Sequence, residues 1–167
     1  MKQRKTLSPN ERSLNKIRHS LYADYIKDLE AIKGKPFPDT DEEKRQWCQD
    51  YIDQNHCNWI DITQDGLIVG FLIICTFPEC HPDCDYFISQ SYVHPDYRKH
   101  HLMTNAVHKF VTEHTGNYCL MILKRNDYAK RFWFNLFQDL NYKPLDLRIV
   151  CEMEEDEIQY GFTPFKH

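Results

Sequence analysis

Residues 92–104 of the chain read Tyr92-Val93-His94-Pro95-Asp96-Tyr97-Arg98-Lys99-His100-His101-Leu102-Met103-Thr104. This segment leaves an apolar, strand-like run, turns at a proline, passes through four basic or imidazole residues and opens an amphipathic helix. The first N–H groups of a helix have no acceptor within the helix, so they attract an anion. Cationic side chains beside them add to that attraction. The segment therefore predicts a site for an anionic ligand at a strand-to-helix turn.

The size and composition of the chain predict one globular domain over residues 1–167. Of its 167 residues, 41% are hydrophobic and 28% are charged, which is typical of a folded and soluble chain. The net charge of −4 argues against nucleic-acid binding driven by phosphate neutralisation. No apolar run approaches the ~20 residues that span a bilayer, and the basic start is not followed by an apolar signal core. We therefore expect a cytoplasmic protein with no nucleic-acid or membrane partner.

Seven cysteines are present, an odd number without paired Cys-x-x-Cys motifs. In the cytoplasm they are expected to be mostly reduced. The segment Cys80-His81-Pro82-Asp83-Cys84 has some resemblance to a metal clip, but it lacks a second pair of ligands. We therefore expect no metal site.

Two helices are predicted before any strand. Apolar residues recur at three- and four-residue steps over residues 14–29, which predicts a buried helical stripe that ends near Gly34. Thr40 and Glu43 have the spacing of a capping box, which predicts a second helix through about Asp53.

The remaining segments alternate between strands and helices. Strands are predicted at 59–63, 67–77, 86–93, 118–123, 145–151 and 157–162, with helices from about 102 to a stop at Gly116 and from 128 to 139. The strand at 67–77 is apolar on both faces, as in a sheet covered by helices. The strand–helix–strand unit from Tyr86 to Leu123 predicts two parallel strands with a right-handed crossover. The fold class is therefore α/β, with a mixed central β-sheet flanked by helices.

Two motifs in this order resemble the GNAT superfamily of N-acetyltransferases. The first is Val93-x-Pro95-x-Tyr97-Arg98, before a loop-to-helix turn that follows the pattern Arg/Gln-x-x-Gly-x-Gly/Ala in that family. The second is Asn126-x-x-Ala129-x-x-Phe132-Trp133, which ends in Leu140-Asn141-Tyr142. The likeness covers residues 59–162, and the two leading helices stand in the expected place.

The resemblance implies acetyl-CoA as the acyl donor and assigns it a binding segment. Backbone N–H groups of the loop Arg98–Thr104 would hold the pyrophosphate, and the backbone at Tyr92 and Val93 would bond the pantetheine amides as an added strand would. Asn126 would lie near the pantetheine arm. The candidate cofactor-binding residues are Tyr92, Val93, Arg98, Lys99, His100, His101, Leu102, Met103, Thr104, Asn126 and Phe132.

Three residues depart from the family pattern. His101 and Met103 stand where the family prefers small residues, and a positive φ at His101 would cost on the order of 1–2 kcal/mol. Trp133 replaces a tyrosine that protonates the departing thiolate in many members, and an indole cannot act as that acid. Tyr92 and Tyr142 are the alternatives for this role.

The implied reaction is direct transfer of acetyl to a primary amine of a small molecule or a peptide. A lysine amine is neutral in only ~1 in 2,500 molecules at pH 7, a cost near 4.6 kcal/mol, whereas an α-amine costs about 1 kcal/mol. Where the family places a glutamate-like base, this chain has Gln90 and Ser91, and Asp85 and Glu79 are the nearest acids. Asp85 and Tyr92 are therefore the catalytic candidates, and a small-molecule or low-pKa amine is favoured as acceptor.

Two other classes of function remain open from the sequence alone. One is a non-catalytic acyl-CoA-binding regulatory module, and the other is an interaction protein with no small-molecule ligand. The acidic run Glu152–Asp156 is interpreted as an exposed hairpin tip or as an attractor of a cationic amine. A homodimer is an open expectation for the assembly.

Overall fold

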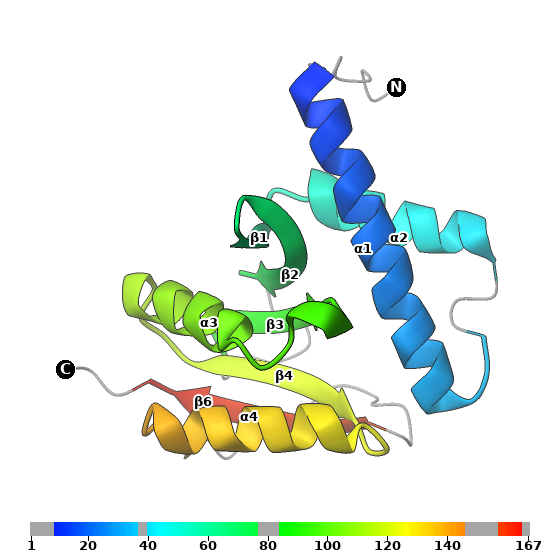
Figure 1. Cartoon of the computed structure of the whole chain (residues 1–167). Coiled ribbons are helices and arrows are strands. Elements are labelled where there is room, and N and C mark those ends of the chain that lie inside the picture. The colour runs from blue at the N-terminus through cyan, green and yellow to red at the C-terminus, as the bar shows by residue number, and fades with distance from the viewer. Residues whose placement is uncertain (1–8, 37–39, 77–83, 146–156, 165–167) are drawn as a thin grey trace.

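The computed structural model of the chain describes residues 9–36, 40–76, 84–145 and 157–164. Its elements are α1 (Pro9–Lys33), α2 (Asp41–Asp53), β1 (Cys57–Gln64), β2 (Leu67–Cys75), β3 (Tyr86–Val93), a 3₁₀ turn η1 (Pro95–Tyr97), α3 (Leu102–Glu113), β4 (Tyr118–Leu123), α4 (Asp127–Asp139), β5 (Lys143–Leu145) and β6 (Glu157–Thr163) (Figure 1). The predicted order of helices and strands is therefore confirmed. The predicted strand at 145–151 is described only up to Leu145, and the rest of it lies outside the described residues.

The strands form one mixed sheet in the order β1-β2-β3-β4-β6-β5. β1 and β2 make the predicted antiparallel hairpin, and β2 pairs antiparallel with β3. β3 and β4 are parallel and are joined by α3, as the strand–helix–strand pattern predicted. In Figure 1, α3 and α4 lie in front of the sheet, and α1 and α2 lie to the right.

The alternation of side chains along β2 divides the core into two layers. Leu72 and Ile74 are buried in a cluster that includes Val107 of α3 and Trp133 of α4. Phe71, Ile73 and Cys75 point to the other face and pack in a second cluster with α1 and α2. Both faces of β2 are therefore covered, which explains why its sequence is a continuous apolar run.

The face that α1 turns to the sheet differs from the predicted stripe. Tyr22 and Ile26 are almost completely buried, whereas Ile17 is 41% exposed. The helix therefore contacts the sheet over a shorter length than the periodicity predicts, because its first turns extend beyond the strands (Figure 1). α2 begins with the predicted capping box: the Glu43 N–H donates to Thr40 Oγ1 at 3.2 Å, and the Thr40 N–H donates to Glu43 Oε2 at 2.9 Å.

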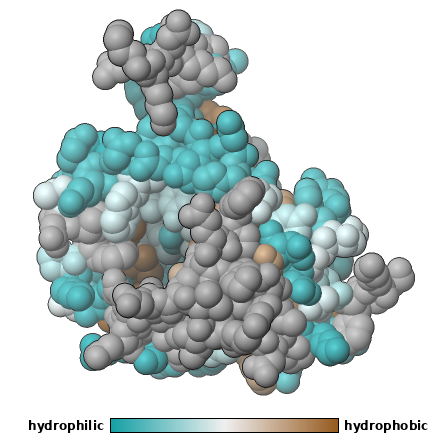
Figure 2. Space-filling view, turned by 180° about the vertical axis from the view of Figure 1, so that it is seen from behind, coloured by the Kyte–Doolittle hydropathy of each residue, from teal (hydrophilic) through white to brown (hydrophobic). Residues whose placement is uncertain are grey.

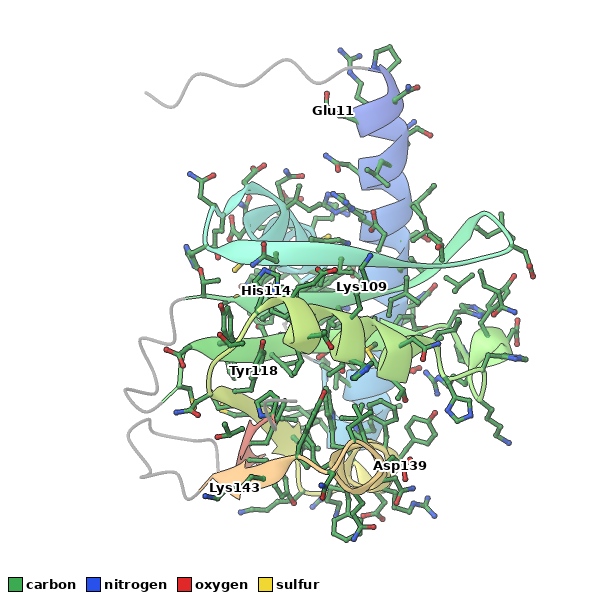
Figure 3. All side chains as sticks on the ribbon, turned by 90° about the vertical axis from the view of Figure 1, so that its left-hand side faces the viewer. Glu11, Lys109, His114, Tyr118, Asp139 and Lys143 are labelled. Atoms are coloured by element: carbon green, nitrogen blue, oxygen red, sulfur yellow. The ribbon has the colours of Figure 1, made fainter. Side chains whose placement is uncertain are left out.

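The turn between α3 and β4 is closed by a hydrogen bond from Tyr118 to His114. The Tyr118 hydroxyl donates to the His114 carbonyl at 2.6 Å, and Figure 3 labels both residues. Gly116 was predicted to stop the helix, but α3 already ends at Glu113. The glycine makes room for a neighbour instead, since a Cβ there would lie 2.7 Å from Asp85 Oδ2.

The surface shows how the apolar core is covered. Seen from behind, most of the coloured surface is hydrophilic, and a hollow on its left side shows hydrophobic side chains at the bottom (Figure 2). Among the described residues, no helix is both long and apolar enough to cross a membrane.

Four buried tyrosines stabilise the fold only while their phenols are protonated. Burial raises the pKa of Tyr22 and Tyr118 well above the ordinary tyrosine value, and it raises the pKa of Tyr92 and Tyr142 to about 12. In the unfolded chain a tyrosine titrates near pH 10. Their contribution is therefore complete below about pH 10 and is lost as the pH rises toward 12.

We expect the free energy of unfolding in urea to fall above about pH 10, by up to about 1.4 kcal/mol per pH unit for each buried tyrosine. The tyrosinate absorbance of these four residues should appear together with the loss of secondary structure. If all ten tyrosines of the chain titrated near pH 10 with the fold intact, this account would be wrong.

Candidate functional site

A cavity of about 560 Å³ opens where β3 ends. Its walls come from α1, from the end of β3, from the loop that leads into α3, and from α4. The predicted residues among its lining are Tyr92, Val93, Arg98, Lys99, His101, Leu102, Met103, Thr104, Asn126 and Phe132. His100 belongs to the same loop but does not line the cavity. Asp139, at the end of α4 and labelled in Figure 3, lines it as well.

The cavity exists because β3 and β4 separate along their length. Their parallel register covers only Tyr86–Ile88 on the β3 side. Beyond it, Gln90–Val93 pair with β2, and Ser89 forms a bulge because Ile73 and Ile74 face Gln90 and Ile88. Among the described strands, none pairs with the other edge of this last part of β3. An extended ligand can therefore bond to that edge as an added strand.

The turn into α3 presents backbone N–H groups to the same cavity. Lys99 and His101 have left-handed backbones, with φ of 71° and 55°. His101 is the N-cap residue of α3, and no side chain caps the helix. The first N–H groups of α3 are therefore available to an anion, with the positive end of the helix dipole behind them. The positive φ considered for His101 is confirmed, whereas the one at Lys99 was not predicted.

Arg98 joins three parts of the cavity wall. Its Nε donates to the Val93 carbonyl at 2.8 Å, and its Nη2 lies 2.7 Å from Asp28 Oδ2 on α1. The guanidinium also lies over the rings of Tyr92 and Tyr128, 5.7 and 5.4 Å from their centroids. The sequence predicted a phosphate ligand at Arg98, and the structure shows that this side chain first of all connects β3 to α1 and α4.

The family of the chain follows from its match to a known domain. The sequence model of the acetyltransferase (GNAT) family matches residues 17–135, more than half of the chain. The chain belongs to this family. It is therefore an acetyltransferase enzyme, and the predicted resemblance is confirmed. Among curated proteins, none matches the sequence.

Solved structures show the same fold at low sequence identity. An acetyltransferase from Thermus thermophilus is 17% identical, with a TM-score of 0.65 over 95% of this chain and 94% of that one. The diaminobutyrate acetyltransferase of Paenibacillus lautus, in complex with L-2,4-diaminobutyric acid and coenzyme A, is 13% identical, with a TM-score of 0.57 over 89% and 90%. An N-acetyltransferase from Thermoplasma acidophilum, in complex with coenzyme A, is 11% identical, with a TM-score of 0.53 over 95% and 96%.

In this acetyltransferase, Tyr92 is a buried phenol beside the cavity. Burial, with a further contribution from Asp28 and Asp24, raises its pKa to about 12. At neutral pH the hydroxyl therefore holds its proton, and it is suited to donate a proton rather than to accept one. Tyr142, the other candidate acid, is buried against Phe162 and does not line the cavity.

Asp85 lies at the far end of β3 from the cavity. Val93 is eight positions further along the chain, about 26 Å at about 3.3 Å per residue of strand. Its carboxylate accepts the Asn117 N–H at 2.8 Å and so closes the turn before β4. The structure therefore does not bring Asp85 together with the other candidates, and Glu79 lies outside the described residues.

At the bulge of β3, near the position of the expected glutamate-like base, the side chains are polar but uncharged. The Gln90 Nε2 donates to the Tyr51 hydroxyl at 3.1 Å, and that hydroxyl lies 2.7 Å from Ser89 Oγ. The Tyr25 hydroxyl donates to Gln90 Oε1. The bulge directs the consecutive side chains of Ser89 and Gln90 toward α1 and α2, and these hydrogen bonds hold them there. Sequence reasoning missed Asp28, Tyr25 and Tyr51 because helical spacing alone does not show which strand residues they meet.

Trp133 lines the cavity and is only 4% exposed. Its indole packs in the core cluster between α4 and the sheet. An indole cannot protonate a thiolate, so Trp133 does not supply the proton that the resemblance implies at this position. In the described part of the chain, no group of three or more His, Cys, Asp or Glu residues is arranged to hold a metal ion. The segment 80–83 lies outside the described residues.

The left-handed backbone of His101 can be tested directly with glycine. We expect His101→Gly to raise the free energy of unfolding by about 1 kcal/mol, because glycine adopts this φ without the Cβ penalty. The adjacent His100, which has no positive φ, is the matched control. His100→Gly should lower stability by a few tenths to 1 kcal/mol through the entropy of the unfolded chain. Equal effects of the two substitutions in urea unfolding would contradict the assigned backbone.

Proposed function

We propose that this acetyltransferase uses acetyl-CoA and transfers its acetyl group directly to a primary amine. The observation that carries the proposal is the cavity, because it joins an open strand edge to an uncapped helix N-terminus. The edge suits the amides of an extended pantetheine arm, and the helix start suits a pyrophosphate. Two of the similar solved structures hold coenzyme A, which supports the choice of donor.

The chemical step makes one C–N bond and breaks one C–S bond. The neutral amine attacks the thioester carbonyl, the C–S bond breaks, and the amine nitrogen loses one proton while the thiolate of CoA gains one. Backbone N–H groups at the end of β3 would polarise the carbonyl. The Tyr92 phenol is a proton donor in this region, since its pKa is about 12. A thiol of pKa about 8.5 is also a tolerable leaving group without an acid.

A large side chain placed in the cavity lining should block the binding of acetyl-CoA and leave the fold unchanged. Ala129 lines the cavity from α4, whereas the exposed Gln138 on the same helix does not. At 100 times its Kd, acetyl-CoA should stabilise the protein by about 2.7 kcal/mol, which raises Tm by roughly 5–10 °C. We expect Ala129→Phe to abolish this shift and Gln138→Phe to retain it.

Inorganic pyrophosphate at the same concentration is the control ligand, and it should give a smaller shift. A shift from acetyl-CoA no larger than that from pyrophosphate would overturn the choice of donor. Thiol release over a panel of amines then tests transfer, and binding with no thiol release from any amine would favour a non-catalytic acyl-CoA-binding module.

The pH dependence should follow the amine rather than the enzyme. We expect kcat/KM to rise from pH 6 with a midpoint set by the pKa of the acceptor, near 7.8 for an α-amine and higher for a lysine-type amine. Tyr92 remains protonated throughout this range because of its raised pKa. A midpoint that stays the same for acceptors of different pKa would instead indicate a titrating base on the enzyme.

A further inference from the structure

Two cysteines face each other across the hairpin of β1 and β2. Cys57, the first residue of β1, and Cys75, the last residue of β2, are partners in the antiparallel register. The Cys57 N–H donates to the Gln54 carbonyl at 3.1 Å, so it does not bond to Cys75. The next pair along the ladder is hydrogen-bonded, with the Thr76 N–H donating to the His56 carbonyl at 2.8 Å. Cys57 and Cys75 are therefore a non-hydrogen-bonded pair, in which Cα atoms are typically about 4.5 Å apart.

Both thiols lie on the face of the sheet that α1 and α2 cover. Cys75 is 7% exposed and belongs to the cluster on this face, and Cys57 packs against the same cluster. The two side chains are hydrogen-bonded to each other. Cys57 is less buried than Cys75, and its Sγ also donates to Gln54 Oε1 at 3.4 Å. A small oxidant can therefore reach the Cys57 sulfur, and the Cys75 sulfur is already in contact with it.

The pair meets the distance requirement of a disulfide. Disulfides join Cα atoms that are about 4.4–6.8 Å apart and Cβ atoms that are about 3.5–4.5 Å apart. The Cβ atoms of opposed residues in an antiparallel pair are about 4.5–5.5 Å apart, with the shorter values in non-hydrogen-bonded pairs. A bond between Cys57 and Cys75 therefore needs only a small approach of the two strand ends. Among the described strands, no other two cysteines are partners in the register.

A bond at this place would strengthen an exposed part of the sheet. β1 is the strand at one edge, so it pairs only with β2. Residues 54–56 join the start of β1 to the end of α2. A covalent link from Cys57 to Cys75 would therefore fasten the edge strand, and the turn that follows α2, to the buried strand β2.

We propose that Cys57 and Cys75 are a reversible oxidation site, at which a hydroperoxide converts the two thiols into a disulfide that fastens β1 to β2. In the first step the Cys57 sulfur attacks the hydroperoxide, an S–O bond forms, the O–O bond breaks, and water leaves when the oxidant is hydrogen peroxide. In the second step the Cys75 sulfur attacks this sulfenic acid, the S–S bond forms, the S–O bond breaks, and a second water leaves. The thiols together give up two electrons and two protons, and the peroxide takes them up. A dithiol reductant reverses the change by exchange.

The reduced pair is the state that the structure shows. Burial raises the pKa of the Cys57 thiol, and its hydrogen bond with Cys75 opposes part of that rise. Little thiolate is therefore present at pH 7, so the first step is slow and needs an excess of peroxide. Neither cysteine lines the cavity at the end of β3, so the inference does not depend on the proposed donor or acceptor.

The test is a peptide map of the folded protein after treatment with excess hydrogen peroxide. The remaining thiols are alkylated in denaturant, and a protease that cleaves before aspartate then separates the two cysteines, because Asp61 and Asp65 lie between them. We expect mass spectrometry to find the peptides of Cys57 and Cys75 joined by a disulfide, and dithiothreitol to separate them.

Single substitutions assign the bond to this pair. Cys57→Ala and Cys75→Ala should each abolish the joined peptides. Cys48→Ala is the matched control and should retain them, because Cys48 is buried in the same cluster but lies on α2. Cys80→Ala should retain them as well, and it excludes a bond to Cys80, which lies on the same peptide as Cys75.

The disulfide should also stabilise the fold. We expect the Tm of the oxidised natural chain to lie roughly 5–10 °C above that of the reduced chain, because the bond closes a loop in the unfolded state, and dithiothreitol should remove the difference. A joined pair without a rise in Tm would contradict the fastening of β1 to β2.

Peroxide treatment in urea is the control for geometry, since the seven cysteines of the unfolded chain should then form a mixture of bonds. The same mixture from the folded protein would overturn the inference, and so would complete alkylation of both Cys57 and Cys75 after peroxide.

Discussion

Parallel pairing between β3 and β4 stops after Ile88, and the candidate functional site depends on this separation. The bulge at Ser89 adds a residue to β3 just beyond that point and turns the strand toward the start of α3. If the two strands stayed paired to their ends, the outer edge of β3 would be occupied and no cavity would open there. The open edge follows from this divergence, and the start of α3 lines the cavity beside it.

Arg98 then determines the shape of the opening. Its guanidinium contacts the Val93 carbonyl, the Asp28 carboxylate and the ring of Tyr128, so one side chain ties the end of β3 to α1 and α4. Asp28 neutralises part of its charge, which leaves the helix N–H groups as the main attraction for an anion. A guanidinium has five N–H donors, so these contacts do not exhaust its capacity to bind a phosphate.

The bulge also determines what kind of chemistry the α1–α2 face supports. It directs Ser89 and Gln90 toward Tyr51 and Tyr25. Hydroxyls and an amide stay uncharged at neutral pH, so this hydrogen-bond network is not changed by titration over the working range. Because no carboxylate takes part in this network of described residues, the amine acceptor that we propose would enter neutral or lose its proton by another route. The cost of that step depends on the pKa of the amine, as the sequence already indicated.

Local patterns in the sequence were sufficient for the order of elements, the capping box of α2, the parallel unit around α3 and the turn that leads into α3. Each of these rests on neighbours within a few positions, such as the spacing of Thr40 and Glu43 or the turn before Leu102. The ion pair of Arg98 with Asp28, the network at Gln90 and the displacement of Asp85 from the site were decided only by the tertiary structure. They join residues that are 39 to 70 positions apart, or separate residues on one strand. Their geometry depends on where the sheet diverges and how α1 crosses it, and no local spacing encodes either.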